Sequence, residues 1–402
     1  MASTDLERLL EISKLRIDGV STAFIREIYR VIEWNSRLIL LKGCRGVGKT
    51  YLMLQHLKMS DKKSVFFSLD HIYFLTNRLS DAIGDMYKEG YRVFALDEIH
   101  KYPDWSIELK NIYDSYADVK LVVTSSSALN ILAGSGDLSR RMDAYLMRGL
   151  SFPEYMVYEH GMLLPTYTFD EMLTDFDAIY ESVYHTFDIE KRFRAYLKKG
   201  YYPFYKEAGN KYHERLAAVV LQVIDSDMAA IFNIDYASAR QIKKLLALIS
   251  RLGPFAPNIT KLSRDLAMSR NSVLTYLDYL SEAGIIHILK SEAKSDSALT
   301  KPDKVFMENT NLLHAFDRTL VNTGTLRETF VFNALVLGGY NVSTPAKGDF
   351  MIDNAYVLEV GGPNKDFHQL SGMPNAVLIK EGTAKGAPNI LPMWMLALLK
   401  KG

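Results

Sequence analysis

The chain has 402 residues, and at roughly 150 residues per domain this length predicts two to three domains. Its 48 basic and 47 acidic side chains leave a formal net charge of +1, which excludes a uniformly basic nucleic-acid coat and an acidic tail protein. A hydrophobic share of 48% against a charged share of 24% is typical of a folded chain rather than a disordered one.

Three features predict a soluble, cytoplasmic protein with no membrane partner. The single cysteine, Cys44, excludes an internal disulfide and is typical of a reducing compartment. The N-terminal residues mix charge into every turn and lack the apolar stretch of a signal peptide. No apolar run approaches the roughly 18–20 residues that a helix needs to span a bilayer.

The first part of the chain alternates between strand-like and helix-like segments. Residues 6–37 place apolar and charged positions at helical spacing and predict one or two helices. Apolar runs rich in β-branched or aromatic residues then predict strands at 37–43, 64–70, 91–98 and 119–126. Helical periodicity fills the gaps between them, at 49–59, 75–89 and 104–117. This alternation predicts an α/β fold with a parallel sheet covered on both faces.

The pattern changes after residue 151. Residues 170–250 are helical in periodicity and rich in tyrosine, and 259–290 predicts two helices, near 260–267 and 270–282, with Ser269 as the N-cap of the second. Gly284 ends that helix, and a strand follows.

After residue 302 the chain returns to short strands. Two of them, DFMID (349–353) and AYVLEV (355–360), are joined by Asp353-Asn354, which predicts a hairpin turn. We expect the last apolar stretch, 390–401, to be amphipathic or buried and to pack onto this part of the chain.

The strongest motif is the run from Gly43 to Thr50, which satisfies the Walker A pattern G-x-x-x-x-G-K-[ST] between a predicted strand and a predicted helix. Its glycines let the backbone N–H groups surround a phosphate, and the next helix adds its positive N-terminal end. Lys49 is expected to reach the β- and γ-phosphates and Thr50 to bind Mg²⁺. The candidate nucleotide-binding residues here are Gly43, Arg45, Gly46, Val47, Gly48, Lys49, Thr50 and Tyr51.

A second motif, Val93 to Glu98, is an apolar strand that ends in two carboxylates, as in the Walker B pattern. After a phosphate loop, Asp97 is the expected second metal-holding residue, beside Thr50. Glu98 is the candidate that orients and deprotonates the attacking water, so the acid pair favours hydrolysis over phosphoryl transfer to a small molecule.

These motifs and their order resemble a prokaryotic AAA+-type P-loop ATPase family that joins an AAA-like core to a winged helix and an uncharacterised C-terminal domain. The resemblance implies four parts: a core at 1–155, a helical lid at 156–236, a winged-helix module at 237–301 and a restriction-endonuclease-like domain at 302–402. It is carried by RGVGKT (45–50), LDEIHKYPDW (96–105), VVTSSSALNIL (122–132), LSRRM (138–142), SFPEY (151–155), GYYPFY (200–205) and GDF…LEVGG (348–362).

The resemblance implies three further site residues, each with a plainer alternative. Ser125, in Thr124-Ser125-Ser126, matches a polar sensor of the γ-phosphate, or this run caps the next helix. Arg141 matches a trans-acting arginine finger, or the two neighbours Arg140 and Arg141 are simply solvated or salt-bridged to acidic side chains. Pro203 matches a lid residue near the adenine, or it belongs to a turn after a helix that ends at Gly200.

The predicted winged helix is the basic part of the chain. Residues 237–301 carry ten basic and five acidic side chains, a net +5, whereas residues 151–236 carry a net −6. As a DNA reader the second helix would present Arg270, Asn271, Thr275 and Tyr276 to the major groove, with Lys261 and Arg264 near phosphates. The alternative is a module used only for packing against the acidic lid.

Three carboxylates of the C-terminal part, Glu328, Asp349 and Glu359, resemble the core of PD-(D/E)XK nucleases. The lysine of that pattern is replaced by Gly361, and Lys365 lies outside the usual spacing. We therefore expect the nuclease fold without nuclease activity.

The sequence as a whole predicts a Mg²⁺-dependent enzyme that binds and hydrolyses ATP and acts as a switch or remodeller on an unknown macromolecule, with ATP and ADP, a protein partner and a homo-oligomer as expected associations. The alternative is an ATP-regulated DNA-binding protein or nuclease. A third reading is a switch that binds ATP and barely turns it over.

Overall fold

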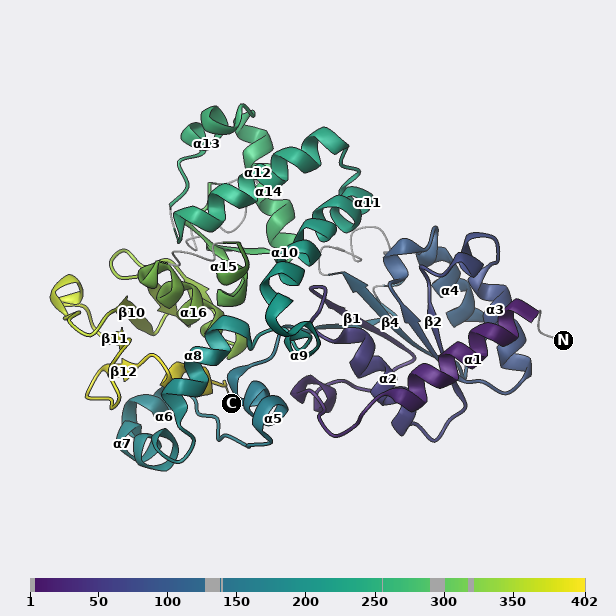
Figure 1. Cartoon of the computed structure of the whole chain (residues 1–402), viewed down its shortest axis with the longest axis horizontal. Helices are drawn as coiled ribbons and strands as arrows, with labels where there is room; N and C mark the ends of the chain where they lie inside the picture. The colour runs from purple at the N-terminus through teal and green to yellow at the C-terminus, as the bar shows by residue number, and fades with distance from the viewer. Residues whose placement is uncertain are drawn as a thin grey trace. The chain divides into compact units, whose positions relative to one another are not determined.

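The structure is a computed structural model, and it describes residues 4–126, 138, 140–254, 256–289, 301–316 and 322–401. The chain divides into two compact units, Met1–Arg148 and Gly149–Gly402 (Figure 1). The boundary expected at residue 155 falls within helix α5 (Phe152–His160), which packs against α8 (Ile189–Lys199) of the second unit. The finer division at 237 and 302 stays a prediction.

The first unit is built on a parallel five-stranded sheet in the order β2-β3-β4-β1-β5, which confirms the predicted α/β core. Its strands are β1 (Leu38–Gly43), β2 (Ser64–Ser68), β3 (Val93–Asp97), β4 (Lys120–Ser126) and β5 (Asp143–Leu146). Its helices are α1 (Thr4–Gly19), α2 (Lys49–Met59), α3 (Leu79–Lys88) and α4 (Trp105–Ser115). The short edge strand β5 was not expected from the sequence.

Helices cover both faces of this sheet. Alternate strand residues, such as Leu40, Phe67 and Leu96, form one core with α3 and α4, while α2 packs on the other face (Figure 1). Helix α1 runs along the edge strand β2, where Phe66 N donates a hydrogen bond of 2.8 Å to Ser13 Oγ. This contact protects an edge that would otherwise expose backbone groups for pairing.

The second unit is mostly helical in its first half. Its helices are α5, α6 (Phe169–Thr174), α7 (Phe176–Ile179), α8, α9 (Tyr205–Ala208), α10 (Tyr212–Gln222), α11 (Ala229–Phe232), α12 (Tyr236–Leu252), α13 (Ile259–Leu266), α14 (Arg270–Glu282), α15 (Thr310–Phe316) and α16 (Thr323–Leu337). Two π-helical turns, η5 (Tyr180–Tyr184) and η7 (Val223–Met228), interrupt this series.

The predicted helix pair is confirmed as α13 and α14. Ser269 caps α14 by accepting a hydrogen bond from Ser272 N at 2.9 Å, and Gly284 follows the helix in a left-handed conformation with φ of 68°. The strand β6 (Ile286–Leu289) then pairs antiparallel with β7 (Lys304–Met307), so two helices are followed by a two-stranded sheet.

A second five-stranded sheet, in the order β12-β11-β10-β9-β8, ends the chain. It consists of β8 (Val342–Ser343), β9 (Phe350–Ile352), β10 (Tyr356–Gly361), β11 (Ala376–Lys380) and β12 (Ile390–Pro392). The hairpin predicted at Asp353-Asn354 is confirmed, because both residues take positive φ values, 47° and 55°, between antiparallel β9 and β10.

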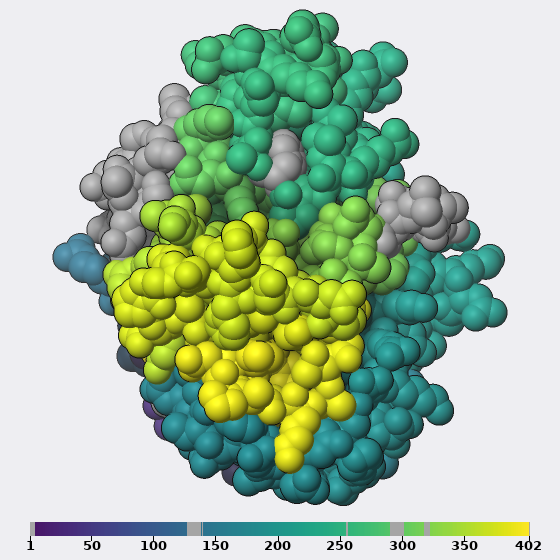
Figure 2. Space-filling model, turned by 90° about the vertical axis from the view of Figure 1, so that its left-hand side faces the viewer, coloured from purple at the N-terminus to yellow at the C-terminus, as the bar shows by residue number. Residues whose placement is uncertain are grey.

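The C-terminal stretch packs onto this unit as expected, and it is buried rather than amphipathic. It forms β12 and a 3₁₀ turn (Met395–Leu398), and Trp394 is 3% exposed. Tyr167 pairs with the residues after this turn through hydrogen bonds to Leu398 O and from Lys400 N. Figure 2 shows the yellow C-terminal residues lying against the blue-green residues of this unit.

Within the described residues, no helix combines the length and apolarity that crossing a bilayer requires.

Candidate functional site

The phosphate-loop candidate, residues 43–50, lies between the end of β1 and the start of α2. Gly46 and Gly48 have φ values of 85° and 99°, in the left-handed region that glycine occupies without a steric penalty. At Gly43 a Cβ atom would lie 2.2 Å from the carbonyl oxygen of Met147, so a side chain there is excluded by close packing. Two of the three glycines are therefore favoured by the backbone conformation of the loop, and Gly43 is favoured by close packing.

Lys49 curls back over this loop. Its side chain is buried, and its ammonium donates hydrogen bonds to Gly43 O at 2.7 Å and to Cys44 O at 3.1 Å. An ammonium held by two carbonyls at the mouth of a glycine loop is placed to exchange them for phosphate oxygens, which are stronger, charged acceptors.

Asp97 is the centre of a small polar cluster at the ends of β3 and β4. The Thr50 hydroxyl lies 2.9 Å and 3.1 Å from its two carboxylate oxygens, and the Thr124 hydroxyl donates to the same carboxylate. Burial raises the pKa of Asp97 above its ordinary value, although the hydrogen bond from Thr124 opposes that shift. A buried carboxylate beside two hydroxyls is an oxygen donor set that fits Mg²⁺.

Glu98 directly follows this cluster and has an unusual environment. Its backbone takes the left-handed conformation, with φ of 57°. One carboxylate oxygen, Oε2, lies 3.5 Å from Arg45, 3.5 Å from His100 and 3.4 Å from Lys101. A non-glycine residue with positive φ at the end of a buried strand is a recurrent feature of functional sites.

These groups meet because parallel strands end at one edge of the sheet. Thr124 of β4 lies opposite Leu41 of β1, so the residues after β1 and the ends of β3 and β4 share that edge. Residues 35–156 match the family model described as "AAA domain".

Residues 35–156 therefore resemble an AAA domain, and they are called the AAA-type domain below.

A second family model, a domain of unknown function (DUF8612), matches residues 190–323. An uncharacterized protein of Methanocaldococcus jannaschii is 27% identical over 388 residues, which cover 88% of this chain and 81% of that protein. It extends the likeness beyond the AAA-type domain into the second unit.

The likeness to the following solved structures is weak. The RuvB Holliday junction branch migration motor of Thermotoga maritima has a TM-score of 0.29 at 15% identity, covering 72% of this chain and 90% of that one. AMPPCP-bound DnaA from Aquifex aeolicus has a TM-score of 0.25 at 14% identity, covering 70% and 89%. A STAND protein with a tetratricopeptide repeat sensor from Pyrococcus horikoshii has a TM-score of 0.31 at 14% identity, covering 79% and 46%.

The hydroxyl next to the acid pair belongs to Thr124, one residue before the expected sensor Ser125. Besides its contact with Asp97, the Thr124 hydroxyl accepts the backbone N–H of Glu98 at 3.0 Å. The Ser125 hydroxyl is buried and has no hydrogen-bond partner among the described residues. The geometry therefore brings Thr124, and not Ser125, to the acid pair.

Arg141 and Tyr51 each have a partner outside the acid cluster. Arg141 forms an ion pair with Asp114 at 3.4 Å, as its plainer alternative holds. The Tyr51 hydroxyl accepts a hydrogen bond of 3.0 Å from Ser21 N. Pro203 lies in the second unit, where its carbonyl accepts the Tyr158 hydroxyl at 3.2 Å.

Sequence reasoning missed Arg26, which is 8% exposed and donates to Val47 O at 2.9 Å and to Arg148 O at 3.0 Å. No motif marks it, because both acceptors are backbone carbonyls and one of them is 122 residues away.

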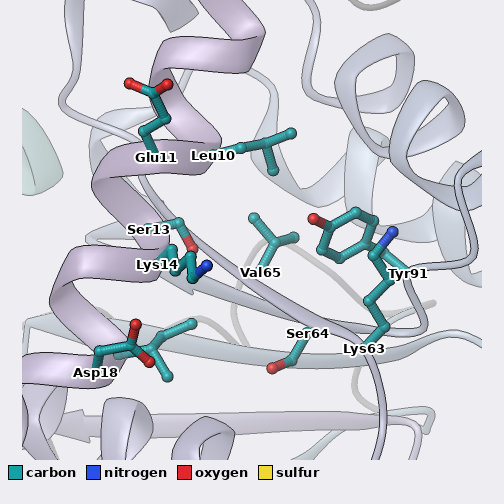
Figure 3. Close-up of a pocket in the computed structure, with 10 residues that line it drawn as sticks. Leu10, Glu11, Ser13, Lys14, Asp18, Lys63, Ser64, Val65 and Tyr91 are labelled. Carbon is teal, nitrogen blue, oxygen red and sulfur yellow. The ribbon is translucent and has the colours of Figure 1, made fainter.

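A separate pocket of about 370 Å³ lies between α1 and the start of β2, lined by Ser13, Lys14, Ser64 and Tyr91 among others (Figure 3). Ser64 is the first residue of β2, whereas Asp97 and the phosphate loop follow strand ends. Because the strands run parallel, this pocket lies at their N-terminal ends, whereas the polar cluster lies at their C-terminal ends.

Each of the three C-terminal carboxylates in the second unit is paired with a lysine. Lys304 lies 3.2 Å from Glu328 and 3.0 Å from Asp349, and Lys365 lies 2.5 Å from Glu359. Among the described residues, no group of three or more His, Cys, Asp or Glu side chains is arranged to hold a metal.

Lys365 also explains the glycine in this part of the chain. A Cβ atom on Gly361 would lie 2.3 Å from Lys365 Cγ, so the stem of Lys365 occupies the space that a side chain at 361 would need.

The α13–α14 pair exposes part of the predicted DNA-reading set. Arg270 and Asn271 are exposed at the start of α14, as are Lys261 and Arg264 on α13. Thr275 is half-buried, and the Tyr276 hydroxyl donates to Gln241 Oε1 at 3.3 Å within the same unit.

Proposed function

We propose that the chain is a Mg²⁺-dependent ATPase whose AAA-type domain binds and hydrolyses ATP. The observation that carries this proposal is the junction of a glycine-shaped phosphate loop with the Thr50–Asp97–Thr124 cluster and Glu98 at one edge of the sheet. Each part supplies one requirement of phosphoryl transfer to water.

The roles follow from the positions of the side chains. The N–H groups of the loop and the N-terminus of α2 bind phosphate oxygens, and Lys49 exchanges its carbonyl contacts for them. Thr50 and Asp97 would hold Mg²⁺, which supplies charge neutralisation at the phosphates when bound. Glu98 orients a water and accepts its proton, while Thr124 fixes the backbone from which Glu98 projects.

The test separates binding from hydrolysis. Lys49→Ala is expected to abolish binding of a fluorescent ATP analogue, whereas Glu98→Gln is expected to bind it and to lose about 10²–10⁴-fold in single-turnover phosphate release. Glu89→Gln, a change of an exposed acid at the end of α3, is the matched control and should hydrolyse ATP at the parental rate. A Glu98→Gln protein as fast as this control would remove Glu98 from the mechanism.

We infer further that hydrolysis drives a switch or remodelling step on another macromolecule, through the second unit. In that setting Arg141 acts in trans on a neighbouring copy, and Pro203 acts as the lid residue near the adenine. If Arg141 has that role, mixing Arg141→Ala subunits into the wild type will lower hydrolysis more than in proportion to their fraction.

A second candidate function is DNA binding by the α13–α14 pair, read as a winged helix. Its support is the exposed set Lys261, Arg264, Arg270 and Asn271 in a stretch of net charge +5. Affinity for duplex DNA measured across a salt series tests it, because phosphate contacts give a steep negative slope. If Arg270→Ala leaves both affinity and slope unchanged, the pair is a packing module.

For the C-terminal sheet we propose a structural role without nuclease activity. The lysines on Glu328, Asp349 and Glu359 support this, because they already neutralise the carboxylates that a nuclease would keep for a metal. Plasmid incubated with Mn²⁺ should stay intact. Cleavage that disappears in Glu359→Ala would refute the proposal.

A further inference from the structure

The segment before the phosphate loop is tied down along α2. Three α2 side chains hold residues 18–24: the Tyr51 hydroxyl accepts from Ser21 N, Gln55 donates to Ser21 O and Phe24 O, and Lys58 donates to Asp18 O and Val20 O. These side chains are four and three residues apart, so they lie on one face of the helix. We call residues 18–26 the strap.

The strap ends in Arg26, whose guanidinium joins two distant backbone positions. One nitrogen donates to Val47 O, inside the phosphate loop, and another to Arg148 O, at the last residue of the first unit. A guanidinium is a rigid planar fork, so displacement of one acceptor carries over to the other. At 8% exposed, Arg26 is well shielded from water, which keeps both hydrogen bonds strong.

A second contact joins the same two segments at the other end of the loop. Met147 N donates to Lys42 O at 2.8 Å, and the carbonyl of Met147 fills the space where Gly43 would carry a Cβ atom. The start of the phosphate loop thus contacts Met147 directly, and Val47 is joined to Arg148 through Arg26, at the point where the chain leaves the first unit.

We propose that Arg26 is a positioning residue that couples the phosphate loop to residues 147–148, so that phosphate occupancy is transmitted to the point where the chain leaves the first unit. The inference deepens the proposed ATPase function and rests on it for its nucleotide-dependent part. When the loop closes on a phosphate with its N–H groups, its outward carbonyls move as well, and Val47 O takes Arg26 and Arg148 with it.

The variant that tests the coupling is Arg26→Lys. It keeps the charge, but a single ammonium on a flexible stem cannot hold both carbonyls in the fork geometry. Arg30→Lys, an exposed arginine four positions on, is the matched control. Lys58→Met loosens the strap from its far end at an exposed position and guards against misfolding of the Arg26 variant.

The first measurement is hydrogen exchange by mass spectrometry without nucleotide. Arg26→Lys should raise exchange at 44–49 and at 147–150 together, by about tenfold, the effect of losing one charged hydrogen bond. Lys58→Met should raise it less, and Arg30→Lys not at all. If Arg26→Lys changes one segment and not the other, or neither, the coupling is refuted, whatever the outcome for ATP.

The second measurement adds Mg²⁺ and ATP. In the wild type, nucleotide should protect both segments. In Arg26→Lys it should protect 44–49 at a higher ATP concentration and leave 147–150 unchanged. A structural role alone would predict weaker binding with normal protection of 147–150 at saturation, and that result would overturn the inference. A wild type unprotected by ATP at 44–49 would instead contradict the proposed ATPase function, while the nucleotide-free comparison still decides the coupling.

Discussion

The hydroxyl of Thr124, at the end of β4, both donates to the Asp97 carboxylate and accepts the backbone N–H of Glu98 at 3.0 Å. One side chain thus fixes the orientation of the expected metal-holding acid and the backbone of the expected catalytic acid. Because Glu98 has a positive φ, its backbone needs such external support to hold that conformation.

We predict that Thr124→Val slows single-turnover ATP hydrolysis by about 10–100-fold, in the range of lost support around a metal site, while ATP affinity changes little. Ser125→Ala is the control, because its hydroxyl has no recorded partner within the described part of the chain, and it should stay within about twofold of the wild type. A larger effect at Ser125 than at Thr124 would reverse this assignment.

The sequence alone does not show which of the two hydroxyls, that of Thr124 or that of Ser125, faces the acid pair. The sequence predicts that Thr124-Ser125-Ser126 ends a strand, and the structure places this run at the end of β4, which pairs with β3. Successive strand residues point to opposite faces of the sheet. Thr124 and Ser125 therefore cannot both face Asp97, and the sequence alone does not show which of them does. Only the register of the sheet fixes which hydroxyl faces Asp97.

The β1–α2 junction can be predicted from the sequence, whereas strand β5 and the role of Arg26 cannot. The β1–α2 junction was predictable because glycine spacing, an apolar strand and a helical stretch all agreed. Strand β5 was missed because three of its four residues are exposed, so it has no apolar run. Arg26 was missed because its partners are backbone carbonyls, which carry no side-chain signal.

The raised pKa of Asp97 predicts a pH dependence of stability. A folded pKa above the unfolded value means that the native state binds the proton more tightly, so stability falls as pH rises from about 3.8 through the folded pKa. Asp97→Asn should therefore raise the melting temperature of the ligand-free protein at pH 7 by about 2–4 °C. It should also abolish the stabilisation that Mg²⁺ and ATP give the wild type.

The contrast for this prediction is Asp70, which is half-exposed and hydrogen-bonded to Ser68. That hydrogen bond lowers the pKa of Asp70. The contribution of Asp70 to folding stability therefore has the opposite sign: it is present above the pKa of the unfolded chain and is lost as pH falls through the folded pKa. Asp70→Asn should leave the melting temperature at pH 7 unchanged or lower. If Asp97→Asn also lowers it, burial is not the dominant effect on Asp97.

His56 predicts acid sensitivity in the first unit. It stacks on Trp34 at a ring distance of 3.8 Å, and burial, with Lys120 nearby, lowers its pKa to about 4. Because the unfolded chain binds the proton at a higher pH, stability is full above about 6.5 and falls as pH drops toward 4. The urea midpoint of His56→Phe should fall less over this range than that of the wild type, whereas His185→Phe, at an exposed site, should behave as the wild type.

Lys304 predicts the cost of opening the C-terminal carboxylate cluster. Burial alone would lower the pKa of this lysine, but Asp349 and Glu328 outweigh it and raise the pKa. Burial has the opposite effect on Glu328 and raises the pKa of its carboxyl group, although the nearby Lys304 lowers that pKa. Lys304→Met removes the shared cation and leaves two partly buried carboxylates facing each other.

The expected loss is about 1–3 kcal/mol in the free energy of unfolding at pH 7, below the value for fully buried pairs because these groups stay partly solvated. The loss should shrink as pH falls, since Glu328, with its raised pKa, takes up a proton more readily than an ordinary glutamate and the repulsion then falls. Urea unfolding of Lys304→Met measures this loss of stability. The control is Lys301→Met, a change of an exposed lysine before the same strand. If the two variants have the same free energy of unfolding at pH 7, Lys304 does not stabilise the carboxylate cluster.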